Sequence, residues 1–176
     1  MLLLLVLGMV VLSVVDMAST REVLVREKKL ETRHLVEAAH SLAAHFDAEY
    51  RAGRLSLSVA QDEALKAMSA MRFDGVEYFW VNDFTYPIPR MVMHPALPAL
   101  NGRILDDPSF DAATSIQVGR DGPLIQTDGK KNLFVAFNEV AGQGGEGYVT
   151  YPWPKPLADG TVTSERYPKL SYVKKV

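Results

Sequence analysis

The chain opens with a continuous run of apolar residues. Residues 1–15 carry no charge, and only Gly8 and Ser13 interrupt the larger apolar side chains before Asp16. A membrane-spanning helix needs about 20 apolar residues and the core of a secretory signal only ~7–15, so this run lies between the two. Residues 16–19 make a poor small-x-small cleavage site, and no basic residue precedes the run. We therefore expect residues 1–19 to form an uncleaved transmembrane anchor, truncated at its N-terminal end.

A helical repeat follows this run and continues to about Tyr50. Its apolar positions share one face at i, i+4, i+7 and i+11, namely Leu35, Ala39, Leu42 and Phe46. Neither Pro nor Gly interrupts the chain between the apolar run and Gly53, which is a candidate C-cap. The pattern predicts one long helix that leaves the membrane and enters the domain. Its apolar stripe can serve the domain's own core or a dimer interface.

The rest of the chain mixes short helical and extended patterns. Ser58-x-x-Gln61 is a capping box that predicts a second helix, and residues 133–140 predict a short amphipathic one. Aromatic and β-branched residues predict strands over the segments 76–81, 90–94, 147–153 and 170–176. Residues 106–128 are expected to be loop-rich, and residues 152–160 to form a Pro-rich turn. Helices followed by antiparallel strands indicate an α+β fold.

Composition excludes several classes of function. The 176 residues carry a net charge of −2, without the basic excess of a nucleic-acid-binding protein. The absence of Cys excludes disulfide scaffolds, thiolate metal sites and thiol nucleophiles. His34, His40 and His45 lack the i, i+4 spacing of a metal pair, and no phosphate-binding or serine-hydrolase motif is present. We expect no enzyme activity, no metal site and no cofactor.

Aromatic and cationic residues gather in the second half of the chain. Tyr78 and Trp80 share one face of their predicted strand, and Arg90 and His94 share a face of the next. Aromatic residues on strands are most often core. However, the polar ends of Tyr and Trp need partners, and neighbouring cations can converge on an anion.

The order of motifs resembles the single-Cache domain, a sensor module of bacterial methyl-accepting chemotaxis proteins. The segments that carry the resemblance are RFDGVEYFWVND (72–83), MVMHP (91–95), LNG (100–102), DGK (128–130), GYVTYPWPKP (147–156) and KLSYVK (169–174). The resemblance covers residues 20–176. It implies a long N-terminal helix packed on a PAS-like antiparallel sheet with inserted short helices. It also implies that the last strand of the family's sheet is missing here, and that the loop 109–127 is longer than usual.

The resemblance further implies a pocket for a small ligand, often a short organic acid. The residues that fall on or beside its motif positions are Tyr78, Trp80, Arg90, His94, Tyr151, Lys169 and Tyr172. A carboxylate would be bound by Arg90 or Lys169 together with a neutral donor such as Tyr151, and aromatic rings would enclose its carbon chain. His94 is equally well explained as a ligand contact or as a hydrogen-bonding residue at a strand end.

We therefore expect the extracytoplasmic sensor domain of a bacterial chemoreceptor, anchored in the inner membrane, facing the periplasm and dimeric through its long helix. Its partner would be a small carboxylate, and signalling would proceed by a shift between two domain states. The alternatives are the sensor of a histidine kinase or diguanylate cyclase, and a free-standing periplasmic solute-binding protein.

Overall fold

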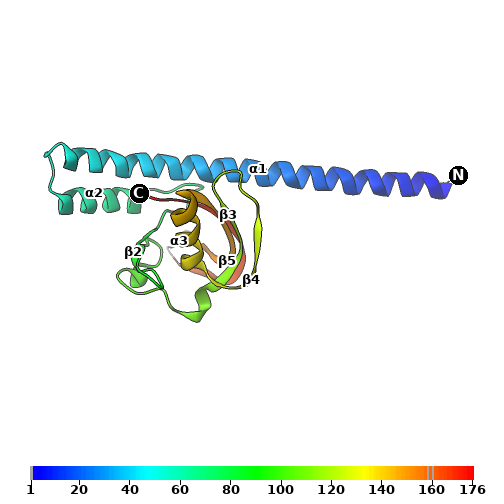
Figure 1. Ribbon diagram of the computed structural model, residues 1–176. Coiled ribbons are helices and arrows are strands. Elements are labelled where there is room, and N and C mark those ends of the chain that lie inside the picture. Colours follow the sequence, from blue (N-terminus) through cyan, green and yellow to red (C-terminus); the bar gives the residue numbers. More distant parts are fainter. Residues whose placement is uncertain (1, 158, 160) are drawn as a thin grey trace.

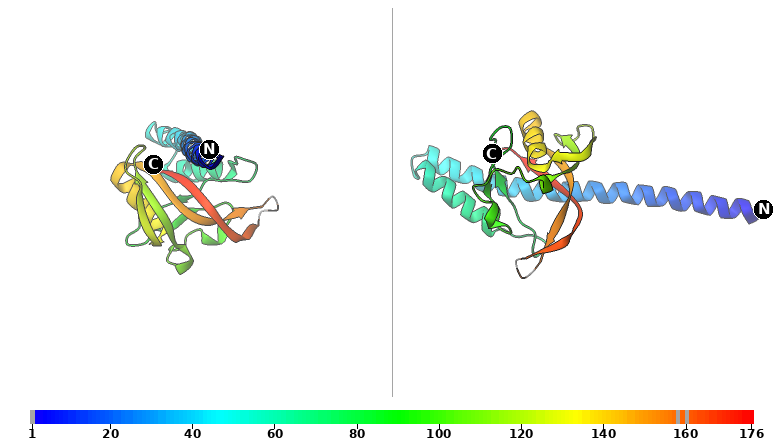
Figure 2. Two further views of the ribbon diagram at one scale, coloured as in Figure 1. Left: turned by 90° about the vertical axis from the view of Figure 1, so that its right-hand side faces the viewer. Right: turned by 90° about the horizontal axis from the view of Figure 1, so that it is seen from below.

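One helix, α1 (Leu2–Arg51), runs past the whole domain and extends far beyond it at the N-terminal end (Figures 1 and 2). The structure is a computed structural model that describes residues 2–157, 159 and 161–176, without the side chains of residues 2–15 and 18. The predicted long helix is confirmed. It crosses residue 20, the expected start of the domain, without a break.

The predicted anchor lies mostly outside the described side chains. Residues 1–15 and 18 make up most of the expected anchor, residues 1–19. Within the part of the chain that is described, no helix is both long and apolar enough to span a membrane.

The C-terminal end of α1 turns back into a second helix, α2 (Leu57–Ala70), which lies alongside it (Figure 1). Gly53 adopts a left-handed φ of 71°, as expected for a C-cap. The predicted capping box at Ser58 is wrong by two residues. Ser56 has the extended backbone of an N-cap, and its Oγ accepts a hydrogen bond from the Val59 backbone N at 3.3 Å.

The two helices share a small apolar cluster. Its buried members are Ala43, Ala64, Met68 and Met93, with Leu42 and Phe46 packed against them. The C-terminal half of the stripe on α1 therefore serves the domain's own core.

The remaining elements form a curved antiparallel sheet with one helix packed on it. The four-stranded sheet has the order β4-β3-β5-β6, and β1 pairs separately with β2. The bounds of these elements are β1 (Val81–Asn82), β2 (Met91–Met93), η1 (Pro98–Leu100), η2 (Pro108–Phe110), β3 (Asp111–Val118), β4 (Ile125–Asn132), α3 (Leu133–Gly144), β5 (Glu146–Pro156) and β6 (Val162–Lys174). The expected fold class, a long N-terminal helix on an antiparallel α+β domain, is confirmed.

The main core lies between the sheet and α3. Phe134, Phe137 and Val140 of α3 are buried against Val149 and Trp153 of β5. The opposite face of the sheet meets α1, where the Tyr148 hydroxyl donates to the Lys29 backbone O at 3.2 Å. Because Tyr148 and Val149 are neighbours on one strand, their side chains leave opposite faces, and α1 and α3 cover the two sides.

Two of the predicted loops are strands. Residues 106–128, expected to be loop-rich, contain β3 and the first residues of β4. The buried positions of β3 include small and polar residues such as Ala113, Ser115 and Gln117. The segment therefore lacks the run of aromatic and β-branched residues that usually predicts a strand. The loop 109–127, expected to be longer than usual, is thus partly a central strand of the sheet.

The Pro-rich turn is also largely strand, since β5 continues through Pro152 and Pro154 to Pro156. β5 pairs with β6 along one edge and with β3 along the other, and the pairing with β3 ends at Thr150. The prolines lie beyond that residue, so their missing N–H groups interrupt no hydrogen bonds to β3, and this explains why they are tolerated.

The predicted strand over residues 76–81 is shorter than expected, because only Val81 and Asn82 pair with β2. Glu77 forms an isolated antiparallel bridge with Phe73, and residues 78–80 run extended beside the sheet without pairing with any strand among the described residues.

We predict that Gly147→Ala destabilises the domain. An added Cβ would lie 2.2 Å from the Gln117 carbonyl O and 2.6 Å from Val140 Cγ1, so the β3–β5 contact would have to open. We expect a loss of about 2 kcal/mol in the free energy of unfolding, measured by urea denaturation. Gly142→Ala is the matched control. Its Cβ would meet only Phe84 at 3.9 Å, and alanine should stabilise α3 by about 0.5–1 kcal/mol. Equal stability of the two variants would contradict this packing.

Candidate functional site

Five of the seven predicted site residues surround one small cavity between the sheet and α3. Its volume is about 10 Å³, roughly the space of one water molecule. The residues that line it are Tyr78, Trp80, His94, Leu133, Phe134, Phe137, Tyr151, Trp153 and Lys169. Polar groups and aromatic rings thus meet at one point of the core.

Strand pairing positions the C-terminal half of this site. Tyr151 of β5 and Lys169 of β6 are directly opposed in the antiparallel ladder, so their side chains leave the same face. Trp153 follows two residues after Tyr151 and shares that face. The α3 helix is fixed above them by its N-cap, Asn132, whose Oδ1 accepts from the Phe134 and Val135 backbone N–H groups.

The two tyrosines of the cavity are buried and neutral. The Tyr151 hydroxyl lies 2.8 Å from Ser171 Oγ, and Trp153 Nε1 donates to the Tyr78 hydroxyl at 3.4 Å. Burial raises the pKa of both phenols above the ordinary range. Each therefore keeps its proton and can donate a hydrogen bond to a ligand.

The backbone around His94 fixes its tautomer. Its Nδ1 accepts a hydrogen bond from the Leu97 backbone N at 2.9 Å, while its own backbone N donates to Asn101 Oδ1 at 2.8 Å. Burial, and then the nearby Lys169 charge, lowers the pKa of His94 to about 4. The ring is neutral at pH 7, and because Nδ1 accepts, the proton sits on Nε2.

Lys169 is the cation of the site. Its Nζ donates to Glu77 Oε2 at 2.6 Å and lies 5.3 Å from the centre of the Tyr78 ring. Both side chains of the ion pair are about one-fifth exposed, 22% for Lys169 and 23% for Glu77. Among the residues that line the small cavity, Lys169 carries the only full charge at neutral pH.

The structure does not bring Arg90 and Tyr172 to this cavity. Arg90 is exposed, and its guanidinium donates to the Gly102 backbone O. Tyr172 is three residues from Lys169 and so leaves the opposite face of β6, where its ring lies 4.9 Å from that of Tyr148. Burial and the neighbouring Glu146 carboxylate raise the pKa of Tyr172.

Several contributors were missed by sequence reasoning. Phe134 and Phe137 belong to a helix predicted only as amphipathic, and nothing in the sequence relates that helix to the tyrosines. Trp153 shares a strand face with Tyr151 by the two-residue alternation, but it was not included among the predicted site residues. Glu77 gives no such signal, since its place opposite Lys169 depends on how the irregular segment 77–80 lies beside β6.

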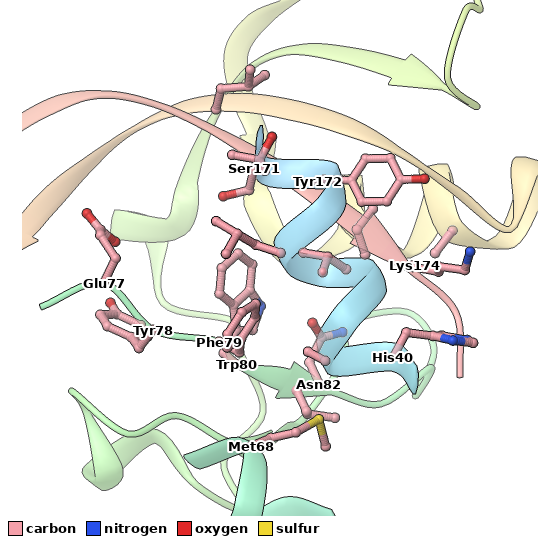
Figure 3. Close-up of a pocket in the computed structure, with 18 of the residues that line it drawn as sticks. His40, Met68, Glu77, Tyr78, Phe79, Trp80, Asn82, Ser171, Tyr172 and Lys174 are labelled. Carbon is pink, nitrogen blue, oxygen red and sulfur yellow. The ribbon is translucent and has the colours of Figure 1, made fainter. Parts of the chain in front are cut away.

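A larger cleft of about 530 Å³ lies on the other side of Tyr78, Trp80 and Lys169, which line both spaces. Its walls are α1, the segment 77–82 and β6 (Figure 3). In Figure 3, Glu77 and Tyr78 lie toward one end of the cleft, and His40 and Lys174 toward the other. The cleft thus follows the outer edge of β6.

Comparisons with known proteins agree with this architecture. A family model described as a Cache domain matches residues 10–176. The methyl-accepting chemotaxis protein McpP of Pseudomonas putida is 36% identical in an alignment 174 residues long. The alignment covers 96% of this chain and 28% of that protein. The chain therefore spans less than a third of the length of this curated relative.

Two solved structures are similar in both sequence and fold. One is described as the periplasmic sensor domain of a chemotaxis protein, with 37% identity, a TM-score of 0.66 and coverage of 85% of this chain and 87% of that one. The other is described as the structural basis for carboxylic acid recognition by a Cache chemosensory domain, with 29% identity, the same TM-score and 87% coverage of both chains. Cache domains are sensing modules rather than enzymes. From the family match, the relative and the shared fold we conclude that this chain belongs to the Cache domain family.

Proposed function

We propose that this chain is the sensor domain of a bacterial chemoreceptor and that it binds a short carboxylate in the small cavity between the sheet and α3. The main support for the proposal is that one ammonium group and several neutral hydrogen-bond donors line the same cavity, surrounded by aromatic rings. The names of the similar proteins support both parts, since one is a chemotaxis receptor and another recognises carboxylic acids.

The chemistry of the cavity suits a monocarboxylate. Lys169 would supply a charge-assisted hydrogen bond to one carboxylate oxygen. His94 Nε2–H and the hydroxyls of Tyr78 and Tyr151 are neutral donors for the remaining acceptor positions. Trp80 and the α3 phenylalanines would enclose a short carbon chain, as Phe137 already lies 5.2 Å from Trp80 and 5.6 Å from Tyr151 between ring centres.

The small volume of the cavity points to small ligands. At about 10 Å³ it must widen for any organic acid, and Tyr78, Trp80 and Lys169 are the walls that separate it from the open cleft. Movement of these side chains would open a route into the cavity. Acids of two or three carbons require the least widening of a closely packed core.

We infer that the larger cleft is a gap at the edge of the sheet and is not the ligand-binding site. It separates the outer edge of β6 from the extended segment 77–82, and in the described residues no backbone hydrogen bond crosses it. The open edge of a strand binds an added extended segment better than a small acid.

Signal transfer would proceed through α1. Polar contacts join the α1 side of the sheet to this helix: Lys29 donates to Gln117 Oε1, and Arg120 donates to Glu37 Oε1 at 3.1 Å. A ligand that moves β5 and β6 by ~1–2 Å would displace α1 by a similar amount. We propose that residues 1–19 anchor this helix in the inner membrane, with the domain in the periplasm and dimeric through α1.

We predict that the chain binds acetate or propionate and that Lys169→Met weakens this binding by at least about 30-fold. The reason is the loss of a charge-assisted hydrogen bond, worth about 2 kcal/mol. Isothermal titration of the purified 176-residue chain in mild detergent measures the affinity. Lys155→Met is the control, since Lys155 is exposed and lies over the Tyr167 ring. Unchanged affinity in Lys169→Met would contradict the proposed site.

We also predict a loss of stability as the pH falls from about 6.5 to 4, caused by His94. Its pKa is about 4 in the folded chain and about 6.5 when unfolded, so in this window the unfolded chain binds a proton that the folded chain does not. The free energy of unfolding should fall by about 2–3 kcal/mol across the window, measured by urea denaturation. His94→Gln should lack this component. The same slope in both proteins would show that His94 is not held neutral by the fold.

A further inference from the structure

The ion pair between Lys169 and Glu77 lies where the small cavity meets the cleft. Lys169 lines both spaces, whereas Glu77 lines only the cleft. In Figure 3 the Glu77 carboxylate lies beyond Tyr78 at the end of the cleft. The ammonium group that would bind a ligand is therefore already bonded, at 2.6 Å, to a carboxylate of the protein.

We propose that Glu77 is an internal competitor, which lowers the affinity of the cavity for carboxylates and is displaced from Lys169 when one binds. This inference rests on the proposed function. It assigns to Glu77 a role in setting affinity and ligand class, although Glu77 lies outside the cavity itself.

Electrostatics favours exchange over simultaneous binding. Lys169 is neutralised by Glu77, so a carboxylate that entered beside an intact pair would add an uncompensated negative charge to a largely buried site. Two carboxylates that share one ammonium also repel each other. Since His94 is neutral, no second cation in the cavity lining offsets this repulsion.

A displaced Glu77 side chain has room in the larger cleft. Its side chain faces the open cleft, where water can solvate a released carboxylate. The ion pair is one-fifth exposed, so breaking it costs far less than breaking a fully buried pair.

Release of Glu77 would also affect the domain beyond the cavity. Its backbone N–H and C=O are held in a tight turn, with reciprocal hydrogen bonds to Phe73 at 2.9 and 3.1 Å. This turn follows directly after α2, which packs on α1. The Lys169–Glu77 bond therefore connects β6 to the turn that follows α2. A ligand that displaces Glu77 would remove this connection.

The test compares propionate binding to wild type and to Glu77→Gln by isothermal titration of the full chain. The amide keeps the size of Glu77 and removes its charge, so we expect the dissociation constant of propionate to fall about tenfold. Glu165→Gln is the matched control: it makes the same change of charge on β6, where the Glu165 side chain is exposed and accepts a hydrogen bond from the Tyr167 hydroxyl. It should stay within about twofold of wild type.

Each outcome decides the question. Unchanged or weaker propionate binding in Glu77→Gln, with wild type still binding, would overturn the competitor role and leave the proposed function standing. If only Glu77→Gln binds propionate, Glu77 competes strongly enough to prevent binding in wild type, and this result would support the proposal. Failure of wild type and both variants to bind would overturn the proposed function and this inference together. Glu77→Asp, whose shorter side chain weakens the contact with Lys169 but keeps the charge, provides a second variant and should fall between wild type and Glu77→Gln.

Discussion

The pairing of β5 with β6 determines which side chains of the sheet face α3 and which face α1. The ladder runs from Glu146 opposite Lys174 to Pro156 opposite Val162, the longest in the molecule as described. Strand alternation then divides the side chains between two environments. One face places Tyr151 and Lys169 beneath α3, and the other directs its residues toward α1. A single hairpin thus supplies both the ligand-binding groups of the proposed cavity and the surface through which a change in that cavity reaches the long helix.

The proposed cavity combines burial with very little charge. Its phenols and its imidazole are kept neutral by desolvation, and its one ammonium is compensated by a carboxylate at the rim. Such a site is stable within the core because no full charge is left without a partner. It also favours anions of single charge, because one lysine offers one charge-assisted contact. The larger cleft, of about 530 Å³, lies instead along the outer edge of β6.

Much of this architecture could be predicted from the sequence, and the failures have physical causes. The long helix, the C-cap at Gly53 and the α+β class follow from local patterns. The strand β3 was missed because its buried positions are small or polar, and the strand run of β5 was cut short because Pro usually ends strands. For the site, the motif resemblance found five of the residues that meet in the cavity. It included Tyr172, which alternation from Lys169 places on the other face, and it could not find Glu77, whose contact is made only in the folded chain.

We propose that a short carboxylate binds in the small cavity and not in the larger cleft. A crystal structure of the chain with bromoacetate, solved with anomalous scattering from bromine, distinguishes the two places. We expect a bromine peak between the α3 phenylalanines and Trp80, with the carboxylate on Lys169 and Glu77 turned toward the cleft. A peak between α1 and β6, with the Lys169–Glu77 pair intact, would contradict it.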